Sequence, residues 1–212
     1  MANAHAEELT LQEWSGGVSP YAVNHKKLGM WLFIVSDALT FTAILIGYSY
    51  LRMATPHWPT PFHLWPSIGI STLMTFFLLS SSLTMVLGVK ASQHGNRSAT
   101  IFWLGFTMFF GILFILLHAN EWKTLMNEGL TLTTDPWAKE VPLFGATFFG
   151  ITGLHMFHVL SGVLYLGAIA IGVGKNRFNA EHVEVCGLYW HFVDLVWMFV
   201  FPLIYLMSVK MH

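Results

Sequence analysis

The sequence predicts an all-α integral membrane protein that forms a single bundle of five transmembrane helices. Of its 212 residues, 55% are hydrophobic and only 10% are charged, whereas soluble domains carry about 25% charged residues. Five apolar stretches approach or exceed the ~20 residues that a helix needs to cross the hydrocarbon core of a membrane. A segment surrounded by lipid must pair its own backbone polar groups, so we expect each stretch to be helical.

The five helices are expected at residues 28–51, 66–89, 99–121, 142–174 and 187–209, and residues 28–212 are expected to form one transmembrane domain. Residues 1–27 are polar and lack the apolar core of a signal peptide, which predicts a short cytoplasmic tail. The chain shows no internal repeat. This observation argues against an inverted-repeat transporter, which would have symmetric halves.

The charges of the chain exclude one class of partner and favour one orientation. The net charge is −1 and no basic block is present, so nucleic acid is not an expected partner. If the amino terminus is inside, the inner segments contain six basic residues and the outer ones contain four. The positive-inside rule therefore favours a cytoplasmic amino terminus and an outer carboxyl terminus. The six inner residues are Lys26, Lys27, Lys90, Arg97, Lys175 and Arg177.

Asp37 is a carboxylic residue deep in the first predicted helix. It follows Leu28 by nine residues, which places it about 14 Å along a helix and near the middle of a ~30 Å hydrocarbon core. A carboxylate at that depth costs at least ~2.5 kcal/mol, so Asp37 is expected to face protein or water. We expect a neutral carboxyl group that donates a hydrogen bond to a histidine or a backbone carbonyl of a neighbouring helix. A proton-handling role and a simple helix–helix contact both fit.

The fourth and fifth predicted helices carry further polar residues at a spacing of three. His155 and His158 share one face of the fourth helix, and His191 and Asp194 share one face of the fifth. Together with Asp37 they predict a buried polar layer shared by three helices. For the histidines, a hydrogen-bond network that fixes helix packing is favoured over a metal site.

The sequence offers no catalytic residue and no metal ligand set. It has no Walker loop, no GxGxxG motif, a single cysteine and no Glu-x-x-His pair, and no nucleophile is accompanied by an oriented base. Glu121 follows His118 by one turn and precedes Trp122 at the outer end of the third helix. Because an acid at the membrane interface costs little, we interpret Glu121 as an interfacial acid.

Four ordered motifs resemble those of subunit III of the haem–copper oxidases, the cytochrome c oxidase subunit III family. They are the segments Gly29–Asp37, Leu117–Trp122, Gly145–Val159 and Tyr189–Trp197. The resemblance extends from Gly29 to the end of the chain. Mitochondrial-type members have seven helices, and this chain resembles the five-helix bacterial type. Asp37 falls on the carbodiimide-reactive carboxylate of the family.

The resemblance implies an accessory role in an enzyme complex of the aerobic respiratory chain. Members bind no haem or copper, which lie in partner subunits. They pack mainly on subunit I, beside subunit II and small subunits, and some belong to respiratory supercomplexes. They hold structural phospholipids, support proton uptake and protect the enzyme during reduction of dioxygen to water. This chain is therefore expected in a bacterial plasma membrane, as a non-catalytic part of a proton-pumping oxidase.

Several alternatives remain at this point. The electron donor of the complex can be cytochrome c or a quinol, because that choice lies in other subunits. A different class is a self-contained haem-binding electron-transfer protein that uses His155 or His158 together with His191. A small transporter is a third class. For lipid head groups, the basic residues of the connection after the fourth helix are the candidates. They are Lys175, Arg177 and His182.

Overall fold

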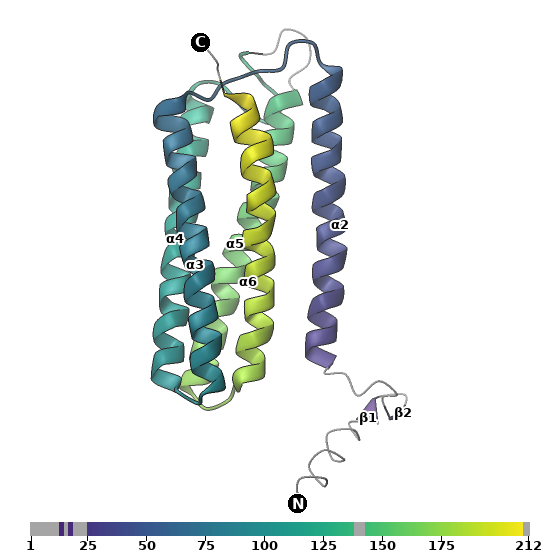
Figure 1. Ribbon diagram of the computed structural model, residues 1–212. Helices are drawn as coiled ribbons and strands as arrows, with labels where there is room; N and C mark the ends of the chain where they lie inside the picture. Colours follow the sequence, from purple (N-terminus) through teal and green to yellow (C-terminus); the bar gives the residue numbers. More distant parts are fainter. Residues whose placement is uncertain (1–12, 15–16, 19–24, 138–142, 210–212) are drawn as a thin grey trace, which may run out of the picture.

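Five long helices, all long and apolar enough to cross a membrane, make up most of the chain. The computed structural model describes residues 13–14, 17–18, 25–137 and 143–209, so most of the predicted tail lies outside the described residues. Figure 1 shows the five helices side by side, with neighbours in the chain running in opposite directions. The helices are α2 (His25–Ala54), α3 (Gly69–Gln93), α4 (Arg97–Asn127), α5 (Leu143–Gly174) and α6 (Ala180–Val200).

Shorter elements extend this framework at the ends. A π-helical turn, η1 (Leu64–Ile68), leads into α3. Two further turns, η2 (Phe201–Tyr205) and η3 (Leu206–Ser208), continue α6. Before α2, strands β1 (Glu13–Trp14) and β2 (Gly17–Val18) form a short antiparallel pair. We name the two ends of the bundle after the ends of α2, the His25 end and the Ala54 end.

Two helices extend well beyond their predicted spans. Helix α6 begins at Ala180, seven residues before the predicted start, and α4 ends at Asn127, six residues after the predicted end. The added segments carry charged residues, such as Glu184 in α6 and Lys123 in α4. A prediction from hydropathy stops at such charged residues, whereas the helix itself can continue past the hydrocarbon into the polar region of the membrane.

Helices α3, α4, α5 and α6 form a tightly packed group, which we call the four-helix bundle. Two tryptophans of α6, seven residues apart and both fully buried, lie at its centre. The Trp190 indole donates a hydrogen bond to Ser81 Oγ of α3 at 2.9 Å. A Cβ atom added to Gly111 of α4 or Gly162 of α5 would lie 2.6 Å or 2.9 Å from the Trp190 ring. Trp190 therefore occupies a slot that depends on two glycines.

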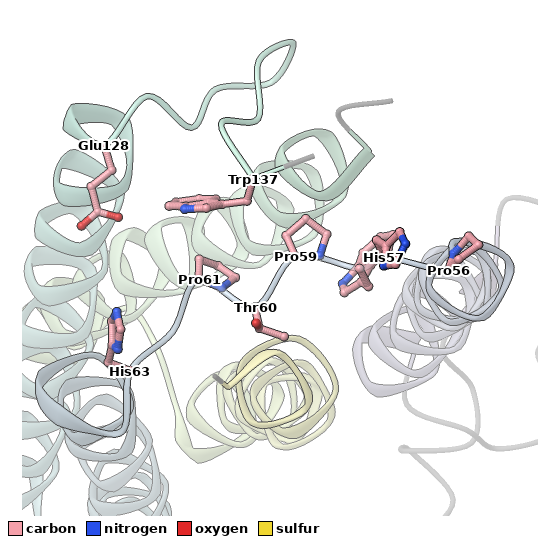
Figure 2. A pocket seen from close by; sticks show the side chains of 9 residues that line it. Pro56, His57, Pro59, Thr60, Pro61, His63, Glu128 and Trp137 are labelled. Carbon is pink, nitrogen blue, oxygen red and sulfur yellow. The ribbon is translucent and has the colours of Figure 1, made fainter. Parts of the chain in front are cut away.

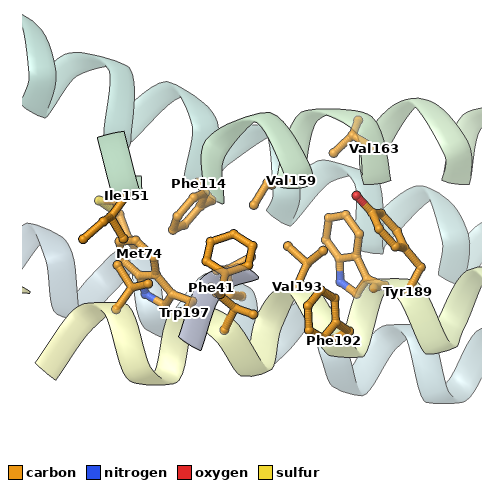
Figure 3. Packing of buried hydrophobic residues seen from close by; sticks show 14 of the residues in the cluster. Phe41, Met74, Phe114, Ile151, Val159, Val163, Tyr189, Phe192, Val193 and Trp197 are labelled. Carbon is orange, nitrogen blue, oxygen red and sulfur yellow. The ribbon is translucent and has the colours of Figure 1, made fainter. Parts of the chain in front are cut away.

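Trp197 makes the same kind of contact nearer the Ala54 end. Its indole N–H donates to Thr75 Oγ1 of α3 at 2.9 Å. Its ring packs edge-on against Phe114 of α4, with ring centroids 4.8 Å apart, and stacks on His155 of α5 at 5.1 Å. Figure 3 shows this side chain among the aromatic and aliphatic residues of the core. Each tryptophan of α6 thus contacts the three other helices of the bundle.

Helix α2 stands beside the four-helix bundle and is largely exposed (Figure 1). Its buried residues, Ile34, Phe41 and Tyr48, recur every seven positions and form one narrow stripe. At the Ala54 end, Arg52 donates to Ser208 Oγ at 2.9 Å and also to the carbonyl of Met207. At the His25 end, ion pairs with α6 hold the helix.

An apolar groove remains between α2 and α6 along the half of α2 nearer the Ala54 end. Its volume is about 330 Å³. Side chains such as Phe41 and Leu45 of α2 line one wall, and Phe199 of α6 lines the other. The groove follows from the narrow contact stripe of α2, since one buried residue per two turns cannot fill the space between two helices.

Candidate functional site

Asp37 meets His158 at the junction between α2 and α5. The Asp37 Oδ2 atom lies 3.0 Å from the His158 Nε2 atom, and both side chains are largely buried. The His158 ring also packs edge-on against Phe41, one turn further along α2. The sequence left a histidine or a backbone carbonyl as the partner of Asp37, and in the structure Asp37 contacts a histidine of the fourth predicted helix.

The second ring nitrogen of His158 fixes part of the proton arrangement. His158 Nδ1 lies 2.8 Å from the carbonyl oxygen of Leu154, and a carbonyl can only accept, so Nδ1 carries a proton. The contact between His158 Nε2 and Asp37 Oδ2 joins α2 to α5 within two of the apolar spans.

His191 contacts a serine of another helix, because its Nδ1 atom lies 2.6 Å from Ser82 Oγ of α3. Asp194 is buried, and its Oδ1 atom has no hydrogen-bond partner among the described residues. His191 and Ser82 therefore connect α6 to α3. The sequence contained a signal for the missed partner, since Ser80–Ser82 is a run of three hydroxyl residues inside an apolar span.

His155 lies apart from both polar contacts. It is fully buried beside Trp197 and Phe114, in the same aromatic group as His118 of α4. Neither ring nitrogen of His155 has a hydrogen-bond partner among the described residues. The predicted polar layer is therefore divided in three: the Asp37–His158 contact, the Ser82-centred contact, and a histidine that packs as an aromatic ring.

Glu121, which the sequence analysis interprets as an interfacial acid, has a side chain that is only 9% exposed. Its Oε2 atom accepts a hydrogen bond from the Tyr205 hydroxyl at 2.7 Å, and its Oε1 atom lies 3.0 Å from Ser71 Oγ of α3. His118 Nδ1 lies 3.8 Å from Oε2. Glu121 is buried because α4 continues six residues past it and because η2 places Tyr205 against its carboxyl group.

The basic residues after α5 differ in their surroundings. Lys175 and Arg177 have exposed side chains at the His25 end. His182 stacks on Phe178, with ring centroids 4.6 Å apart, and its Nε2 atom lies 3.2 Å from Lys26 Nζ of α2. His182 therefore connects α2 to α6, whereas the other two side chains are exposed.

Within the described ranges, no group of three or more His, Cys, Asp or Glu residues is arranged to hold a metal ion. His158 and His191 are each engaged by a different helix, through Asp37 and Ser82. The buried polar groups thus act chemically as helix-to-helix contacts. The class that the fold and these contacts define is a multi-pass membrane protein in which polar side chains hold the spans together.

Comparison with known proteins identifies the particular family. The sequence model described as cytochrome c oxidase subunit III matches residues 9–209, and the chain belongs to this family. Cytochrome c oxidase subunit 3 of Bacillus sp. (strain PS3) is 31% identical over 211 residues, which cover 96% of this chain and 98% of that protein. Quinol oxidase subunit 3 of Bacillus subtilis (strain 168) is 29% identical, covering 85% of this chain and 86% of that one.

A third relative has a different length. The heme-copper oxidase subunit I+III of Aeropyrum pernix is 29% identical over 216 residues, which cover 96% of this chain but 25% of that protein. The chain is thus a subunit III of a haem–copper oxidase and part of an oxidase complex with the other oxidase subunits. The resemblance and the fold class deduced from the sequence are both confirmed.

Proposed function

We propose that this chain is the non-catalytic subunit III of a cytochrome c oxidase, that it packs on subunit I, and that it supports proton uptake and stability of the complex. The observation that carries this proposal is the use of the buried polar side chains: Asp37 binds His158 across α2 and α5, and Ser82 joins α3 to α6. Such contacts hold helices together. The Aeropyrum pernix relative, which is named as a subunit I+III, supports the contact with subunit I.

A quinol oxidase subunit III is the second candidate, because relatives with that name are 29% identical to this chain. Purification of the complex in mild detergent tests both readings. We expect the chain to co-purify with a haem-bearing subunit, and the complex to consume oxygen with reduced cytochrome c. Oxygen consumption with a quinol only would favour the second candidate. A folded chain purified without partners would contradict the proposal, and a haem spectrum from that chain would favour an electron-transfer protein.

We further propose a bacterial plasma membrane location with the His25 end in the cytoplasm, as the distribution of basic residues favours. Lys175 and Thr133 are exposed at opposite ends of the bundle, and the native Cys186 is buried. In intact cells, a membrane-impermeant thiol reagent should label Thr133→Cys and spare Lys175→Cys. The reverse pattern would invert the orientation.

We also propose that the subunit retains phospholipid. The groove between α2 and α6 has the apolar lining that an acyl chain requires, and the exposed Lys175 and Arg177 suit an anionic head group. Native mass spectrometry of the complex should detect retained lipid. The joint change of Lys175 and Arg177 to Gln should reduce the anionic lipid, and Lys90→Gln, at the same end, is the matched control. Equal lipid content in all three proteins would contradict the head-group assignment.

A further inference from the structure

Next to Glu121, the Ala54 end of the bundle contains a small cavity lined by both polar and apolar residues. Its volume is about 120 Å³, which is room for roughly four water molecules at ~30 Å³ each. It lies between the connection before α3 and the last turns of α4, where Asn120, Glu121 and Thr124 contribute to its wall. Ser67 of η1 faces it from the opposite side.

The cavity adjoins a larger hollow at the surface. That hollow has a volume of about 750 Å³ and is lined by the Pro56–Pro61 segment, His63, Glu128 and Trp137. Three residues, Pro61, His63 and Glu128, line both spaces. In Figure 2, Glu128 and His63 lie at one end of the hollow and His57 lies toward the other. The shared residues place the cavity beside this surface hollow at the Ala54 end.

Polar groups of three elements surround the carboxyl group of Glu121, a residue of the cavity wall. Tyr205 of η2 donates to Oε2, Ser71 of α3 lies against Oε1, and His118 of α4 lies 3.8 Å from Oε2. On α5, His155 belongs to the aromatic group around Trp197 that also contains His118. At the cavity mouth, the titratable groups are His63 and Glu128.

The contacts of Ser71 allow Glu121 to exist with or without a proton. The single hydroxyl proton of Ser71 lies between two acceptors, the Ser67 carbonyl at 2.9 Å and Glu121 Oε1 at 3.0 Å. With a proton on Oε1, Glu121 donates to Ser71, and Ser71 donates to Ser67. Without that proton, the Ser71 hydroxyl turns and donates to Oε1. Rotation of one hydroxyl group thus accommodates both states, and no helix has to move.

We propose that Glu121 is a proton-exchange site of this subunit, which takes up and releases a proton through water in the cavity at the Ala54 end. In the release step, the O–H bond of the Glu121 carboxyl breaks and the proton passes to a cavity water, which becomes hydronium. The site goes beyond the accessory role proposed above, and it does not depend on Asp37, which lies on another helix and pairs with His158.

Infrared spectroscopy of the whole oxidase complex tests the proposal. The carboxylic C=O stretching band of Glu121 should appear and disappear with pH, and Glu121→Gln should abolish it. Asp37→Asn is the matched control and should leave this band in place. In the wild type, transfer to D₂O should shift the band quickly. Asn120→Leu, which puts an apolar side chain in the cavity wall, should keep the band and slow that shift.

Two outcomes would overturn the proposal: no pH-dependent band that Glu121→Gln removes, or an exchange rate that Asn120→Leu does not change. If Glu121→Gln does not assemble, Ser71→Ala keeps the acid and removes its hydroxyl partner. The band should then move in frequency while remaining pH-dependent. An unmoved band in Ser71→Ala would equally contradict the assignment to Glu121.

Discussion

Helix α2 and the four-helix bundle are held by different forces. In the bundle, Trp190 and Trp197 of α6 are fully buried and each contacts the three other helices. Helix α2 has one buried residue every two turns and adds polar contacts at three levels. These levels are the ion pairs at the His25 end, the Asp37–His158 contact in the middle and Arg52 at the Ala54 end.

The difference indicates where each region is sensitive to change. Dense packing spreads the stability of the bundle over many contacts, but it leaves no room for added atoms. The attachment of α2 depends on a few side chains, so single polar substitutions there should matter more than apolar ones. The groove between α2 and α6 is a consequence of the same sparse contact. The expected effects of substitution therefore decrease from the bundle centre to the ends of α2.

The largest effect is expected from filling the slot of Trp190. Gly162→Val adds a side chain whose Cβ atom alone would lie 2.9 Å from the indole ring. Overpacking of this kind costs about 1–3 kcal/mol or more, and the complex should lose this subunit at a lower temperature. Gly150→Val is the matched control on the same helix, since nothing lies within 4 Å of the added Cβ atom. Equal loss of thermal stability in both variants would contradict the close packing of Gly162 against Trp190.

An intermediate effect is expected from the middle attachment of α2. Asp37→Leu leaves His158 Nε2 without its partner, and an unsatisfied buried group costs about 1–3 kcal/mol. The subunit should therefore dissociate more readily during purification. Asp37→Asn keeps the size and a hydrogen-bond donor, so the complex should assemble with turnover reduced modestly or not at all. Oxygen consumption and proton release in liposomes measure this. An assembled Asn variant that loses nearly all turnover or pumping would make Asp37 a proton carrier.

Much of the fold was predictable because hydropathy alone locates helices in lipid. The end of α4 and the start of α6 could not be predicted from hydropathy, since these turns contain charged residues such as Glu184. Within the site, a spacing of three correctly put His155 and His158 on one helix, yet only His158 reaches Asp37. The rotation of each helix decides which partner a side chain meets. Packing such as that of Trp190 against Gly111 and Gly162 can set that rotation, and spacing along one helix carries no information about it.

The burial of Glu121 illustrates the same limit. The sequence placed this acid correctly near the end of a helix, but its partners Ser71 and Tyr205 lie 50 and 84 positions away in the chain. Tyr205 belongs to η2, which lies within the last predicted span and continues α6 as a π-helical turn. Neither contact follows a local pattern, so the sequence offered only the inexpensive interfacial position for Glu121.

The smallest effect is expected at the His25 end, where Lys27 pairs with Glu184 and Gln93 also donates to Glu184 at 2.7 Å. The side chains are 42% and 23% exposed, and exposed ion pairs contribute about 0–1 kcal/mol. Lys27→Glu should therefore lower the thermal stability of the complex by less than Asp37→Leu does. Adding Glu184→Lys restores opposite charges and should recover part of the loss. Because salt screens exposed charges, the thermal stabilities of the wild type, the two single variants and the double variant should converge at high ionic strength. Lys90→Glu, at the same end, controls for the change in net charge, and an equal loss there would rule out a specific role for the pair.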